Sequence, residues 1–339
     1  MTLSDRENPL PNPGQPEQDP LSPSSTAASS DRAPVLSGGE QTPTLGSSGF
    51  SEAPFRSAAR PAPTDPYLPE DLRISWSWAH LIVFLLFGFL SLLAIQAIFA
   101  AYLASGHHWT RAQLEQALIA DPDFIVGSNV LWFLFLLLFL YVTVGVLRGL
   151  PFWHSLGWRR FRQPKIGESN RPWLYLGGGC LLSLCVAAAS ATVKSTGHIP
   201  IQDLFKSRNG AILLMAMAVL VAPVIEETVF RGYLYPLLAN KFARVANRFG
   251  VEPAAAVRWG ITGSIGVTGT LFGLLHGAQL GWTWGFVSLL ILVGIVFTLA
   301  RARTGTVLAS YLLHLGYNGT IAVTTIIATH GFRQMPPMQ

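Results

Sequence analysis

Charged residues and cysteines are both scarce in this sequence. Asp, Glu, Lys and Arg make up only 12% of the 339 residues, while 50% are hydrophobic. So few charges are atypical of a soluble protein, and the apolar runs are long enough to cross about 30 Å of hydrocarbon. With Cys180 and Cys185 as its two cysteines, the chain has no disulfide framework from which to infer a redox compartment. This composition indicates an integral membrane protein.

The first 70 residues lack apolar runs altogether. They hold 13 of the 23 prolines, and four Lys or Arg against nine Asp or Glu. No apolar stretch follows Met1, so we expect no secretory signal, and the acidity argues against an organellar transit peptide. With too few apolar residues to form a core, residues 1–72 are predicted to be a disordered cytoplasmic tail.

Apolar stretches of helical length fill the rest of the chain. We therefore predict an all-α, multi-pass integral membrane protein with a bundle of seven or eight transmembrane helices. Residues 73–204 are assigned to N-terminal transmembrane helices and residues 205–330 to a core that carries the chemistry. The expected helices are about Ala79–Leu103, Phe124–Leu147, Trp173–Val193, Ala211–Phe230, Gly260–His276, Trp282–Ala300 and Thr306–Ala328.

The loops differ in charge, which predicts their orientation. Residues 148–172, 231–258 and 301–305 are rich in Lys and Arg, whereas 104–123 holds one Arg against three acids. By the positive-inside rule, the basic loops and the tail lie in the cytoplasm and the C-terminus lies on the opposite side. We expect a bacterial-type plasma membrane. The basic balance is typical of cytoplasmic loops, and we expect no nucleic-acid partner.

Two adjacent acids and an arginine end one of the apolar stretches. A charge at the centre of a transmembrane helix costs about 2.5–3.5 kcal/mol on insertion scales, against about 0.3–0.6 gained per large apolar residue. Ionisable residues in such a position usually face the bundle interior and carry function. Glu227 and Arg231 are spaced i,i+4 and should pair, which leaves Glu226 as the free carboxylate. Pro223 predicts a kink just before the acids that could admit water.

Three more polar side chains lie in later apolar stretches. His276 follows Phe272 by one helical turn, and His314 precedes Asn318 by one turn. Taken singly, a buried histidine is more often a packing residue, and a His/Asn pair can simply bridge helices. Together with Glu226, they supply a base that can activate water and donors that can hold an oxyanion.

These residues resemble the three motifs of the CAAX-protease and bacteriocin-processing family of intramembrane endopeptidases. The motifs are Glu226-Glu227-x-x-x-Arg231, Phe272-x-x-x-His276 and His314-x-x-x-Asn318, in order within about residues 205–330. The resemblance implies peptide hydrolysis within the membrane, on prenylated proteins in some members. It also implies that Glu226 and His276 activate water, that His314 and Asn318 stabilise the oxyanion, and that Glu227 and Arg231 support them.

Several alternatives stay open from the sequence. Glu226, His276 and His314 could form a three-ligand zinc site, although a metal-free glutamate mechanism is favoured. A non-catalytic scaffold or bacteriocin self-immunity protein of the same family is a second interpretation, and a proton-coupled transporter is a third. The expected partners are the lipid bilayer and a membrane protein or peptide substrate, and the oligomeric state is undetermined.

The depths of the two motif helices conflict. Counting from the predicted ends places Glu226 near the cytoplasmic end of its helix and His276 near the opposite end of the next. A shared site requires similar depth, so we expect the Ala211–Phe230 helix to continue through residues 232–238. We also expect residues 277–281 to dip into a polar cavity.

Overall fold

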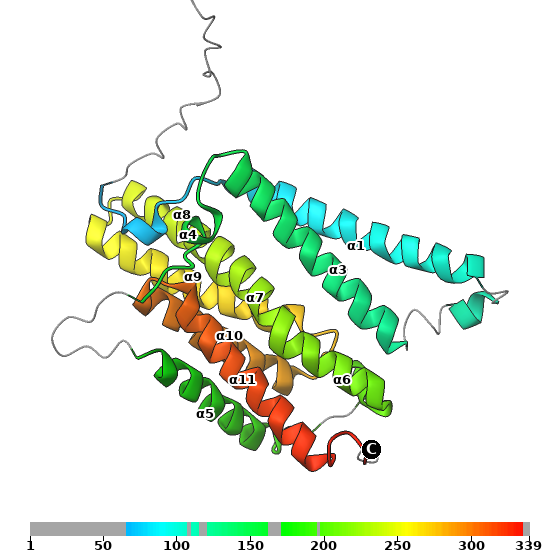
Figure 1. The fold of residues 1–339 in the computed structure, drawn as a ribbon. Coiled ribbons are helices and arrows are strands. Elements are labelled where there is room, and N and C mark those ends of the chain that lie inside the picture. Colours follow the sequence, from blue (N-terminus) through cyan, green and yellow to red (C-terminus); the bar gives the residue numbers. More distant parts are fainter. Residues whose placement is uncertain (1–65, 107–109, 115–120, 162–170, 195–196, 335–339) are drawn as a thin grey trace, which may run out of the picture. The chain divides into compact units, whose positions relative to one another are not determined.

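The structure is a computed structural model, and it describes residues 66–106, 110–114, 121–161, 171–194 and 197–334. Within those ranges the chain is helical and contains no strand. The predicted disorder of residues 1–65 lies outside the described residues. The longer helices shown in Figure 1 are α1 (Trp78–Gly106), α3 (Pro122–Leu140), α5 (Pro172–Ser190), α6 (Arg208–Ala216), α7 (Ala222–Glu227), α8 (Tyr235–Arg248), α9 (Pro253–Leu275), α10 (Trp284–Thr304) and α11 (Val307–Ala328).

Each of the seven predicted apolar stretches lies in a helix, which confirms the all-α membrane class. Among the described residues, five helices are long and apolar enough to cross a membrane: Trp78–Tyr102, Pro122–Val146, Pro172–Ser190, Arg208–Arg248 and Trp284–Thr304. The count of seven or eight spans stays a prediction. Helix α9 begins earlier than hydropathy indicated, because the Glu252 carboxylate caps it by accepting from the N–H groups of Ala254 and Ala255.

The fourth apolar stretch belongs to one continuous helix of 41 residues, Arg208–Arg248. Two π-helical segments, η4 (Met217–Val221) and η5 (Thr228–Leu234), join α6, α7 and α8 within it. The helix thus runs past Arg231, as the depth argument required. Its last part, α8, is amphipathic, so hydropathy alone ended the helix too soon.

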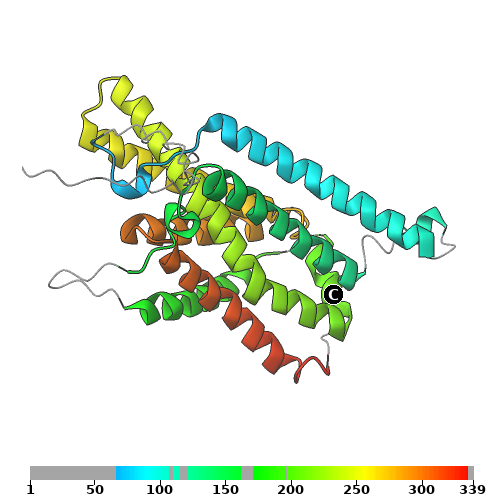
Figure 2. The same ribbon diagram turned by 45° about the horizontal axis from the view of Figure 1, so that its top comes forward.

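The helices pack in pairs, one of which includes the last part of the long helix. α8 packs against α9, α9 against α10, α5 against α11 and α1 against α3, and Figures 1 and 2 both show the last two pairs side by side. Glycine permits the closest approaches. A Cβ on Gly179 of α5 would meet the backbone carbonyl of Leu313, and one on Gly316 of α11 would meet that of Leu176. This contact sets the position of α11, which carries His314 and Asn318.

A short segment before α1 lies against the far end of the long helix. Leu72 is buried and its carbonyl accepts from Asn240 of α8, while Asp71 pairs with the buried Arg301 of α10 at 3.0 Å. Trp76 donates from its indole N–H to the Tyr233 carbonyl. Residues 66–72 therefore differ from the predicted disordered tail, because Leu72 finds an apolar partner in Tyr235 that the local sequence does not reveal.

Candidate active site

A cavity of about 490 Å³ lies between α3, α5, the long helix, α10 and α11. Four of the predicted site residues line it: Glu226, His276, His314 and Asn318. Most of the remaining wall is apolar, with Phe133, Leu214, Met217, Phe286 and Leu290 among its side chains. The cavity therefore combines a small polar centre with room for an apolar group.

Glu227 and Arg231 form the expected ion pair. Arg231 Nη1 lies 2.9 Å from Glu227 Oε1, and both side chains are fully buried. Arg231 also donates to the carbonyl of Gly294 and the hydroxyl of Thr298 on α10, and its guanidinium carbon lies 4.5 Å from the centre of the Phe272 ring. The buried charge is thus satisfied by hydrogen bonds and an aromatic face, and these contacts hold α7, α9 and α10 together.

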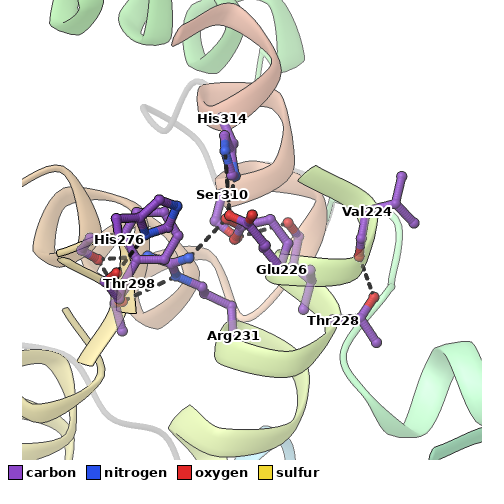
Figure 3. Close-up of polar contacts among 12 residues, drawn as sticks. Val224, Glu226, Thr228, Arg231, His276, Thr298, Ser310 and His314 are labelled. Carbon is purple, nitrogen blue, oxygen red and sulfur yellow. Dashed lines mark hydrogen bonds and ion pairs between the residues drawn. The ribbon is translucent and has the colours of Figure 1, made fainter. Parts of the chain in front are cut away.

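His314 lies between the two acids. Its Nδ1 is 2.9 Å from Glu227 Oε1, and its Nε2 is 3.9 Å from Glu226 Oε2. A carboxylate accepts hydrogen bonds, so Nδ1 carries a proton and donates to Glu227. The ring is therefore fixed with Nε2 towards Glu226, and Figure 3 shows His314 projecting from α11 towards that acid.

His276 ends α9 at the cavity wall. Its Nδ1 lies 2.7 Å from the backbone carbonyl of Phe272, which can only accept, so Nδ1 carries the proton here as well. Nε2 is then the basic nitrogen of this ring. The Phe272 ring is 4.8 Å from that of His276, so the aromatic residue of the motif supports both the histidine and Arg231.

Asn318 lies one turn beyond His314 on α11. Its Nδ2 donates to the backbone carbonyl of Ala218 at 2.7 Å, and Ala218 belongs to the π-helical segment η4. An amide nitrogen carries two hydrogens, so a second N–H remains for another acceptor in the cavity.

The structure thus brings the predicted residues together around one cavity. The longer helix removes the depth conflict, and Gln279 and Leu280 of the turn after His276 reach the cavity wall. Sequence reasoning missed the bond from His314 to Glu227 and the contacts of Arg231 with Gly294 and Thr298. The sequence indicated that Glu227, the acid beside Glu226, has a supporting role. No local pattern indicates which histidine, distant in the chain, Glu227 orients.

Within the described ranges, no group of three or more His, Cys, Asp or Glu side chains is placed to hold a metal ion. His276 and His314 each use Nδ1 in a hydrogen bond within the protein, so only their Nε2 atoms could serve as metal ligands. The metal-free mechanism stays a prediction.

Part of the chain matches a known family. Residues 208–320, about a third of the chain, match the family model described as type II CAAX prenyl endopeptidase Rce1-like. No curated protein and no solved structure matches the chain. The matched range contains the whole long helix, α9, α10 and every predicted site residue. The chain is therefore an all-α membrane protein, and the match of residues 208–320 to the Rce1-like type II CAAX prenyl endopeptidase family model agrees with the resemblance of its three motifs.

Proposed function

We propose that this protein is an endopeptidase that cleaves membrane-associated proteins with water activated by Glu226. The observation that carries the proposal is the geometry of the acid pair and His314. One acid is buried with Arg231 and orients the imidazole, while the other faces the cavity 3.9 Å from Nε2 of the same ring. Two adjacent carboxylates in such different environments are suited to different roles.

The reaction follows from the free atoms of each side chain. A water in the cavity gives a proton to the Glu226 carboxylate, and its oxygen attacks the carbonyl carbon of the scissile bond. The resulting oxyanion accepts from the second N–H of Asn318 and from an Nε2–H of His314 in its doubly protonated form, with the ring held by Glu227. Collapse breaks the C–N bond, and the proton passes to the leaving amine.

His276 completes the proton path. Because Nδ1 is held by the Phe272 carbonyl, Nε2 can accept a proton from the attacking water or return it to the amine. The peptide is thereby split into an acid and an amine with the consumption of one water. Glu227 and Arg231 take no part in proton transfer. Their role is to hold His314 and to join the helices.

The cavity wall supports a substrate that brings apolar surface with it. Aromatic and aliphatic side chains from α3, α10 and α11 surround the polar centre, and a lipid-modified or membrane-spanning segment would bury its apolar part there. We propose lipidated or transmembrane proteins as the substrate class. The basic segment at residues 148–172 and the basic side chains of α8 favour an orientation with the N-terminal tail in the cytoplasm, and the structure corrects the expected 231–258 loop, because most of it is helical. We propose a bacterial-type plasma membrane as the location.

The decisive experiment uses purified protein in proteoliposomes with farnesylated and unmodified peptide panels. We expect cleavage by the wild type and a loss of about 10²–10⁴-fold in rate for Glu226→Gln, the usual contribution of a general base. The variant should keep the wild-type melting temperature, because Glu226 faces the cavity. Cleavage by Glu226→Gln at the wild-type rate would refute the mechanism. No cleavage of any substrate would favour the scaffold or immunity role.

A further inference from the structure

The carbonyl that anchors Asn318 lies in an irregular part of the long helix. In segment η4 the N–H of Ala222 donates to the carbonyl of Met217, five residues back. In that register the next carbonyl, that of Ala218, would accept from residue 223. Residue 223 is Pro223, which has no N–H to donate. The proline therefore leaves the Ala218 carbonyl without its helical donor.

The Asn318 side chain occupies this acceptor. Its Nδ2 lies 2.7 Å from the Ala218 oxygen, within a normal hydrogen bond, and the side chain is partly buried. Ala218 is partly buried at the cavity wall, where a carbonyl without a donor is costly, so the bond stabilises the helix as well as the side chain. The π-helical turn, the proline and the asparagine therefore act as one unit across the interface of α7 and α11.

The bond also decides which end of the amide faces the cavity. An amide group can rotate by half a turn and exchange its oxygen and nitrogen. Anchoring one N–H on Ala218 directs the second N–H, and not the oxygen, towards a developing negative charge. An amide oxygen in that place would repel an oxyanion.

We propose that Pro223 is a positioning residue for Asn318, because it removes the backbone N–H that would otherwise compete for the Ala218 carbonyl. The catalytic part of this proposal rests on the proposed function. Pro223→Ala restores a backbone N–H at residue 223, which can bond the Ala218 carbonyl and release the amide. The release of Asn318 can be measured in two ways, by thermal stability and by cleavage rate, and the stability measurement does not require the protein to cleave a substrate.

The first readout is a thermal-stability cycle in detergent with Pro223→Ala, Asn318→Ala and the double variant. In the wild-type background, Asn318→Ala leaves the Ala218 carbonyl without a donor and should lower the melting temperature. In the Pro223→Ala background the new N–H of residue 223 donates to the Ala218 carbonyl. Asn318→Ala should then lower the melting temperature by less than half as much as in the wild-type background. Equal losses in the two backgrounds would overturn the proposal, whether or not the protein cleaves any substrate.

The second readout is the cleavage rate. Removal of one oxyanion donor typically costs about 10²–10³-fold in kcat, so Pro223→Ala, which only releases the donor, should lower kcat by about tenfold or more at unchanged KM. The double variant should be no slower than Asn318→Ala alone. A Pro223→Ala enzyme with wild-type kcat would contradict the positioning role. A double variant that multiplies the two single losses would contradict it as well.

Pro236 supplies the matched control. It repeats the arrangement later in the same helix, where the N–H of Tyr235 donates to the carbonyl of Phe230 and the next residue is the proline. Pro236→Ala also restores an N–H in a buried part of the helix, but away from Asn318. In the Pro236→Ala background, Asn318→Ala should lower the melting temperature by as much as it does in the wild-type background. A reduced loss here would show that the coupling is not specific to Pro223.

Discussion

Glu227 Oε1 lies 2.9 Å from Arg231 Nη1 and 2.9 Å from His314 Nδ1. A single carboxylate oxygen therefore links a cation on its own helix to an imidazole on α11. The i,i+4 rule accounts for the first contact, and tertiary structure alone supplies the second. Because the oxygen accepts from both groups, the acid pair divides into one residue that orients and one that faces the cavity.

Glu227→Gln should affect both stability and activity, whereas Glu226→Gln should affect activity alone. It leaves the buried Arg231 guanidinium without a counter-charge, and breaking a buried ion pair typically costs about 3–5 kcal/mol. We expect a markedly lower melting temperature in detergent and slower cleavage, because His314 loses the carboxylate that orients its ring. Glu226→Gln should lose activity with little change in stability.

The double variant Glu227→Gln, Arg231→Met tests the reason for that loss. Removal of both charges leaves no unpaired ion, so its melting temperature should exceed that of Glu227→Gln alone. A double variant less stable than either single variant would show that the unpaired Arg231 charge is not the cause of the stability loss in Glu227→Gln. Differential scanning fluorimetry in one detergent is sufficient for the comparison.

Asp203 gives a pH-dependent prediction outside the membrane-spanning helices. It lies in η3 (Pro200–Lys206) at the cavity edge, and hydrogen bonds from Lys206 and His198 lower its pKa below the ordinary 3.8. A depressed pKa stabilises the fold above the unfolded value, and this contribution is lost as the pH falls through the folded value. The side chain is 28% exposed, so the effect should stay below about 1 kcal/mol.

The matching measurement compares wild type with Asp203→Asn between about pH 3 and 6. The wild type should melt at a slightly higher temperature above about pH 4, and the difference should vanish at the acidic end. A difference that grows as the pH falls would have the wrong sign. Asp121→Asn, which removes a helix-capping carboxylate at α3, serves as the control for a general effect of lost acids.

The sequence was informative about helices and about residue types, and less so about contacts. Apolar runs predicted every long helix, because a bilayer selects for length and hydropathy in a continuous segment. They ended the Arg208–Arg248 helix too early, because α8 is amphipathic and gains its stability from packing on α9. The bonds of Asn318 to Ala218 and of His314 to Glu227 join residues far apart in the chain. Spacing along one helix carries no information about such pairs.

Metal dependence is decided by a chelator. A glutamate mechanism predicts that activity persists after treatment with a strong zinc chelator and that metal analysis finds less than stoichiometric zinc. Glu226, His276 and His314 are the candidate zinc ligands, and each of the two imidazoles would have to bind through Nε2. Loss of activity on chelation, with recovery on addition of zinc, would replace the glutamate mechanism by a metal-assisted one. A zinc-stripped protein with unchanged kcat would retain it.

The glycines between α5 and α11 should control the site from outside the cavity. A Cβ at Gly179 would clash with the backbone carbonyl of Leu313, the residue before His314, and backbone atoms cannot move aside as a flexible side chain can. Overpacking of this kind costs about 1–3 kcal/mol, so Gly179→Ala should lower the melting temperature. It should also slow cleavage, because α11 must shift and take the His314 ring with it.

Gly177 is the matched position, since it lies on the same helix and a Cβ there would meet nothing within 4 Å. Gly177→Ala should leave cleavage unchanged and keep or slightly raise the melting temperature, because alanine is the better helix former. If both variants behave alike, the α5–α11 contact does not set the position of His314. If Gly179→Ala alone loses stability and kcat, the close approach of these two helices is part of what places His314 beside Glu226.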